Sequence, residues 1–99
     1  MAEFNGPRQD LAIYPGGDLV AKGLSDLERH VRSVEALLVL VASPRLRGLG
    51  FDIPEEPDLP KPYEHVLFDE VERQHERGAH AAYNALIQKM VSFAQSYKP

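Results

Sequence analysis

Four prolines in a short stretch constrain this chain more than any other feature of its sequence. They stand at positions 54, 57, 60 and 62 of the segment FDIPEEPDLPKP. Proline fixes its own φ angle, donates no backbone hydrogen bond and disfavours helix in the residue before it. Residues 48–62 are therefore predicted to form an extended linker between two helical regions. Pro62 suits the first position of the second region.

The apolar residues before the linker recur at alternating spacings of four and three. This period is typical of a helix that packs along another helix at a shallow angle. Pro44 disfavours helix at Ser43, so the first helix is expected to cover about 19–43, with a weak point at Gly23. Alternatively it begins at Ser25, which with Glu28 forms a capping box. A short turn, PRLR, follows and Gly48 closes it. The apolar residues with this spacing are Val20, Leu24, Leu27, Val31, Val34, Leu38 and Val41.

The residues after the linker predict a second helix over about 63–96. Its apolar stripe is interrupted by the polar side chain of His75, and Glu72 lies about 60° to one side of that stripe on a helical wheel. Gly78 is the one position where this helix could bend or split. The stripe consists of Phe68, Val71, His75, Ala79, Ala82, Leu86, Met90, Phe93 and Tyr97.

These elements predict an all-α protein, in which residues 1–17 form an N-terminal arm and residues 18–99 form a single helical hairpin. The run EALLVLVA is apolar on every side, and the end of the second helix is similar. Two antiparallel helices cannot cover both sets, so we expect a homodimer or higher homo-oligomer, with two hairpins forming a four-helix bundle. The alternative is a monomer whose N-terminal arm covers the outward residues. Those residues are Leu37, Leu40, Ile87 and Val91.

Composition narrows the function classes. Hydrophobic residues make up 43% of the chain and charged residues 26%, as in ordinary soluble domains. The absence of cysteine excludes disulfides, thiolate metal sites and cysteine nucleophiles, and it suits a cytoplasmic location. The sequence shows no signal peptide, and its longest apolar run, 36–42, is too short to cross a membrane. A net charge of −4 argues against nonspecific nucleic-acid binding.

Glu35, Glu72 and His75 are the candidate metal ligands. Residues three apart share a helix face, so Glu72 and His75 point the same way, and Glu35 of the neighbouring helix should reach the same level. This set resembles the ferritin-like pattern, particularly its two-helix versions that complete a site by dimerising. The resemblance implies a carboxylate-bridged site for iron, manganese or zinc. The alternative is a structural contact, in which His75 hydrogen-bonds to a carboxylate and fixes the helix register.

Arg73 and His80 form a second candidate pair, on the opposite face of the second predicted helix. Their R-x6-H spacing is similar to that of the HEPN family of small helical proteins, and the resemblance implies a dimeric, metal-independent ribonuclease. Arginine would stabilise phosphorane charge and histidine would move the proton. The leading interpretation is a noncatalytic, self-associating or partner-binding module. A metal-binding protein and a ribonuclease are the alternatives.

Overall fold

The structure of this protein is a computed structural model that describes residues 11–97. The predicted all-α class is confirmed, because these residues contain helices and no strand. The predicted pair of long helices is wrong, because five shorter helices take its place. Residues 1–10 of the predicted arm lie outside the described range. The elements are a 3-10 turn, η1 (Leu11–Ile13), and the helices α2 (Gly17–Glu28), α3 (Val34–Val41), α4 (Ser43–Gly48), α5 (Tyr63–Gln74) and α6 (Ala79–Ser96).

The first predicted helix is divided into α2 and α3. His30 adopts a φ of 59°, a left-handed conformation that cannot continue a right-handed helix. Ser33 then begins α3 as its N-cap, because its Oγ accepts a hydrogen bond from the amide of Ala36 at 3.1 Å. The alternating apolar spacing crosses this break, so periodicity alone suggested a continuity that the backbone does not have.

Asp26 holds the end of α2 to the start of α3. Its side chain is only 1% exposed and accepts hydrogen bonds from Lys22 Nζ at 2.7 Å, Arg29 Nη2 at 2.6 Å and Ser33 Oγ at 2.5 Å. These donors, Lys22 first and Ser33 second, lower the pKa of Asp26 to about 2, although burial opposes them. A buried carboxylate with three donors therefore fixes the change of direction between the two helices.

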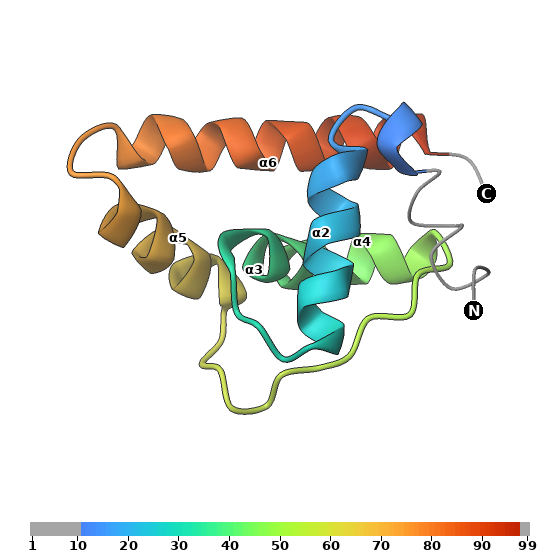
Figure 1. The fold of residues 1–99 in the computed structure, drawn as a ribbon, viewed down its shortest axis with the longest axis horizontal. Coiled ribbons are helices and arrows are strands. Elements are labelled where there is room, and N and C mark those ends of the chain that lie inside the picture. The colour runs from blue at the N-terminus through green and yellow to red at the C-terminus, as the bar shows by residue number, and fades with distance from the viewer. Residues whose placement is uncertain (1–10, 98–99) are drawn as a thin grey trace.

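α3 is the central helix of the core (Figure 1). It packs against α2, α5 and α6, and α4 follows it directly. A helix that is apolar all round is buried all round, and residues 36–40 are indeed all buried. The covering comes from the same chain, however. Leu37 and Leu40 are 2% and 1% exposed, so their prediction as interaction residues is wrong.

Side chains from the helices hold the linker in place. Residues 49–62 contain neither helix nor strand. The Nε and Nη2 atoms of Arg47 in α4 donate to the carbonyl oxygen of Ile53, at 3.2 and 2.7 Å, and the side chain of Ile53 is buried. Arg32, between α2 and α3, pairs with Glu56 at 3.2 Å. In Figure 1 the linker passes below the C-terminal end of α2 on its way from α4 to α5.

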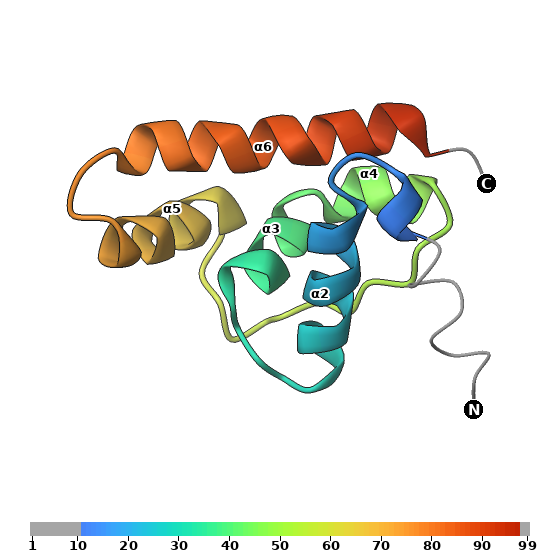
Figure 2. The ribbon, with the colours of Figure 1, turned by 45° about the horizontal axis from the view of Figure 1, so that its top comes forward.

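The second predicted helix is also divided. α5 ends at Gln74, and the chain reverses before α6 begins at Ala79. Gly78, the break point that the sequence suggested, has a φ of 77° and caps α6. α6 then returns past α5, α3 and α2 along one side of the molecule (Figures 1 and 2). Neither α6 nor any other described helix has the length and apolarity needed to cross a membrane.

Aromatic rings fasten the end of α6 to the rest of the chain. Phe93 is fully buried and stacks on Tyr97, with ring centroids 5.4 Å apart. Tyr14, after η1, meets the edge of Phe93 at 6.0 Å, and Phe51 of the linker lies at the same distance. These contacts place the residues just before α2 against α6. The prediction had instead assigned those residues to a separate N-terminal arm.

Candidate functional site

The three predicted metal ligands are not brought together within one chain. Glu35 lies in the first turn of α3, half-buried, with Oε1 3.6 Å from Lys22 Nζ. Glu72 is exposed on α5. His75 is the C-cap of α5, exposed and in extended backbone, because the helix ends before it. The Glu-x-x-His face that the sequence predicted requires a continuous helix through His75, and that helix stops one residue short.

Among residues 11–97, no group of three His, Asp or Glu side chains could hold a metal ion. Iron, manganese or zinc bound by Glu35, Glu72 and His75 together is therefore not supported in a single chain. The form of the site in which a twofold partner completes the ligand set stays a prediction.

Glu35 and His75 do share one cavity, which we call the α3 cavity. It has a volume of about 390 Å³ and lies where α3, α5 and α6 meet. Lys89 contributes an ammonium group to it. Ser33 also lines it, but its hydroxyl donates to Asp26 and accepts from Ala36, so it is not paired with the imidazole as a nucleophile would be. Its other lining residues are Val34, Val71, Gln74, Ala82, Ala85 and Leu86.

Arg73 and His80 are separated by the turn between α5 and α6. The Nε of Arg73 lies 3.5 Å from Glu70 Oε1, and the Arg73 side chain is 76% exposed. His80, in the first turn of α6, packs on Phe68 instead, with ring centroids 4.9 Å apart. Because the predicted helix is broken between them, the two residues do not share a face or line a common cavity in this structure.

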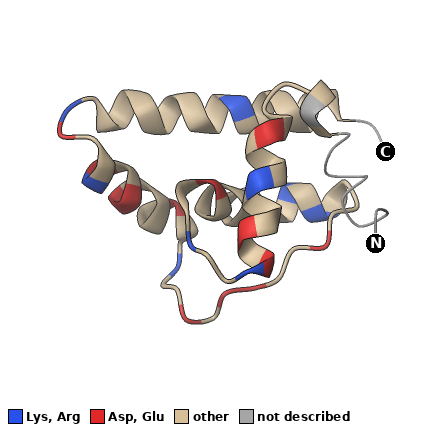
Figure 3. Ribbon diagram, viewed as in Figure 1, with Lys and Arg blue, Asp and Glu red and all other residues tan. Residues whose placement is uncertain are grey.

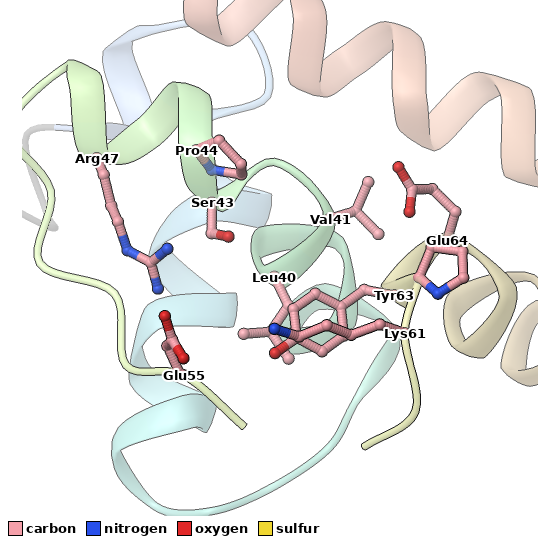
Figure 4. A pocket seen from close by; sticks show the side chains of 10 residues that line it. Leu40, Val41, Ser43, Pro44, Arg47, Glu55, Lys61, Tyr63 and Glu64 are labelled. Atoms are coloured by element: carbon pink, nitrogen blue, oxygen red, sulfur yellow. The ribbon is translucent and has the colours of Figure 1, made fainter. Parts of the chain in front are cut away.

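A second cavity, the linker cavity, lies between α3, α4 and the end of the linker. Its volume is about 520 Å³. Arg47 and Glu55 lie at one end and Glu64 at the other, while Lys61 lies over the ring of Tyr63 at 5.7 Å (Figure 4). Two cations and two carboxylates line it together, so its charge favours neither anions nor cations. The other lining residues are Leu40, Val41, Ser43, Pro44 and Pro62.

A third cavity, the aromatic cavity, lies between α5 and the first half of α6, with a volume of about 330 Å³. Phe68 is its centre: the ring of Tyr83 meets it edge-on at 5.5 Å, and that of His80 at 4.9 Å. Burial, and secondly the charge of Glu64, raise the pKa of Tyr83. The complete lining is Glu64, His65, Phe68, Asp69, His80, Tyr83 and Asn84.

Sequence reasoning did not predict this aromatic grouping, because it treated residues 63–96 as one helix. A signal was present, however. Phe68 stands ten residues before Gly78 and Tyr83 five residues after it, on either side of the one break point that the sequence suggested. A chain reversal at Gly78 brings such positions together across two antiparallel helices.

The comparisons with known proteins give no family. Protein-family models, curated proteins and solved structures all yielded no match to this chain.

Proposed function

We propose that this protein is a noncatalytic interaction module that self-associates through one face of α6. This is the function that the sequence favoured, with a different interface. Leu37 and Leu40 are buried, whereas Ile87 is half-buried and Val91 is 46% exposed. One observation supports the proposal most: the exposed face of α6 carries no charge. The residues of this α6 face are Ala81, Asn84, Ala85, Gln88, Val91, Ser92 and Gln95.

The α6 face is continuous. Its residues recur at spacings of three and four, so they lie on one side of the helix, about 120° wide at 100° per residue. From Ala81 to Gln95 the face is roughly 21 Å long at 1.5 Å per residue. Lys89 is the one Lys, Arg, Asp or Glu residue of α6, and the rest of the α6 ribbon carries neither charge colour (Figure 3). On a helical wheel Lys89 lies about 40° beyond Ala85, at the edge of the face. In a chain with 26% charged residues, an exposed helix face of this length without charge favours contact with another surface.

A second copy of the chain is the partner that fits this face. The seven positions are symmetric about Gln88, so antiparallel pairing across a twofold axis would bring each into register with another member of the face. Ala85 would lie opposite Val91 of the partner subunit, a small side chain against a larger one. Such an isologous contact places no like charges together within the face. One helix pair buries less area than a standard interface, so the dimer is expected to be weak and concentration-dependent.

Sedimentation velocity tests the dimer. Wild-type protein is expected to shift from monomer to dimer over roughly 10 µM to 1 mM, the range of a small interface. Ala85→Glu puts a like charge on both copies and should abolish the shift, because each glutamate would be desolvated at the contact. Arg45→Gln on α4 is the control, since it changes the net charge equally at an exposed residue away from α6.

The antiparallel register has its own test. Adding Val91→Lys to Ala85→Glu would place each lysine opposite a glutamate of the other copy and should restore dimerisation. A wild-type chain that stays monomeric throughout the concentration range would contradict self-association. A dimer that Ala85→Glu leaves intact would contradict this interface.

A further inference from the structure

The aromatic cavity is built around the ring of Phe68. The rings of His80 and Tyr83 lie 4.9 and 5.5 Å from it, between α5 and α6. The side chain of Phe68 is half-buried and points to this cavity as well as to both neighbouring rings. Ring faces carry negative partial charge, so several rings around one space attract a cation.

The formal charges around the same cavity have one sign. Glu64 and Asp69, on α5, are its acidic residues, and neither lysine nor arginine lines it. Glu64 and Tyr83 line the same cavity, and the charge of Glu64 contributes, after burial, to the raised pKa of the Tyr83 phenol. Glu64 also lines the linker cavity, which contains Lys61, but neither Glu64 nor Asp69 forms an ion pair among the described residues. The cavity is thus negative at its rim and aromatic within.

We propose that the aromatic cavity binds a weakly hydrated organic cation, a quaternary ammonium or guanidinium group. Such a cation loses little hydration on entering, contacts the rings through its face or methyl groups, and is balanced by Glu64 and Asp69. An inorganic cation does not suit the site, because the described residues offer no three-ligand set. The volume of about 330 Å³ is enough for a small free quaternary amine or for the end of a basic side chain of another protein.

Comparing the binding of choline with that of its neutral isostere 3,3-dimethylbutan-1-ol separates the effect of ligand charge from that of ligand shape. In ¹H–¹⁵N NMR titrations, choline should shift the amides of residues 64–69 and 80–84 with saturation in the millimolar range, as expected of a shallow site. The alcohol should bind at least about tenfold more weakly, since only the cation interacts with ring faces and carboxylates. Equal amounts of sodium chloride control for ionic strength. Equal binding of choline and alcohol would overturn the proposal.

Variants test the two components separately. Phe68→Leu, which keeps an apolar side chain, should weaken choline binding about three- to tenfold. Glu64→Gln combined with Asp69→Asn should weaken it by about fivefold without removing any ring. Glu72→Gln is the matched control, an exposed glutamate of α5 outside the cavity, and should bind as wild type does. If the double amide variant binds choline as tightly as Glu72→Gln, the proposed charge recognition is wrong.

A further titration identifies the source of the cation. A short arginine-containing peptide that binds at least about tenfold more tightly than choline would identify a protein side chain as the ligand, and the reverse order would identify a free quaternary amine. The inference does not rest on dimerisation, although Asn84 belongs to both surfaces. Repeating the choline titration on Ala85→Glu, which is designed to be monomeric, keeps failure of one proposal distinguishable from failure of the other.

Discussion

Replacing Gly23 with alanine is expected to destabilise the protein by about 1–3 kcal/mol, and replacing it with valine by more than that range. Gly23 lies where α2 crosses α3. A Cβ atom built at this position would collide with the backbone carbonyl of Glu35 and with Cγ2 of Val39. Backbone atoms cannot turn aside as a flexible side chain can, so the two helices would have to separate. Urea unfolding, read by circular dichroism, measures the change.

Gly48→Ala is the control for this prediction, because it separates packing from helix propensity. Alanine is favoured over glycine in a helix by about 1 kcal/mol. A Cβ at Gly48, in the last turn of α4, meets no atom within 4 Å. Gly48→Ala is therefore expected to be neutral or slightly stabilising. A Gly23→Ala variant that is as stable as Gly48→Ala would contradict the close crossing of α2 and α3.

Asp26→Ala is expected to cost about 2–4 kcal/mol, and Asp26→Asn about half as much. The loss follows from removing the acceptor of Ser33, which is itself the N-cap of α3. Lys22 and Arg29 contribute less to the cost, since their side chains are 54% and 66% exposed and water screens them. Thermal unfolding of the variants at neutral pH measures the effect.

The contribution of Asp26 should also depend on pH in a predictable direction. Its pKa in the folded protein is about 2, below the ordinary value of 3.8. A lowered pKa means that the stabilisation is complete above about pH 4 and is lost as the pH falls through 2. The difference in free energy of unfolding between wild type and Asp26→Asn should therefore shrink between pH 4 and pH 2. A difference in free energy of unfolding between wild type and Asp26→Asn that stays constant down to pH 2 would contradict this role of Asp26.

The errors of the sequence reading have a common cause. The alternating spacing from Val20 to Val41 is satisfied by two short helices on either side of a bend as well as by one long helix. What separates them is a left-handed residue, His30, and a set of side-chain hydrogen bonds to Asp26. Neither leaves a periodic signal. The prediction that Glu35 lies beside Glu72 and His75 required two long, straight helices. Because both helices are broken, the three side chains do not form that site within one chain.

The candidate surfaces were predictable to different degrees. Val91 and Ile87 were selected because they lie off the apolar stripe, and they remain accessible on α6. Leu37 and Leu40 were selected by the same reasoning, yet both are buried in the core of the same chain. The aromatic cavity was not predicted, since it depends on the chain reversing between α5 and α6.

The sequence by itself determined that this protein is helical, that prolines separate its two halves and that α3 is buried on all sides. Those properties follow from local backbone preferences and from the transfer of apolar side chains out of water, which each residue type carries with it. Only the tertiary structure decided where the helices break, what covers α3 and which side chains meet across α5 and α6. Such contacts join residues far apart in the chain, and their energies depend on geometry that no local pattern records.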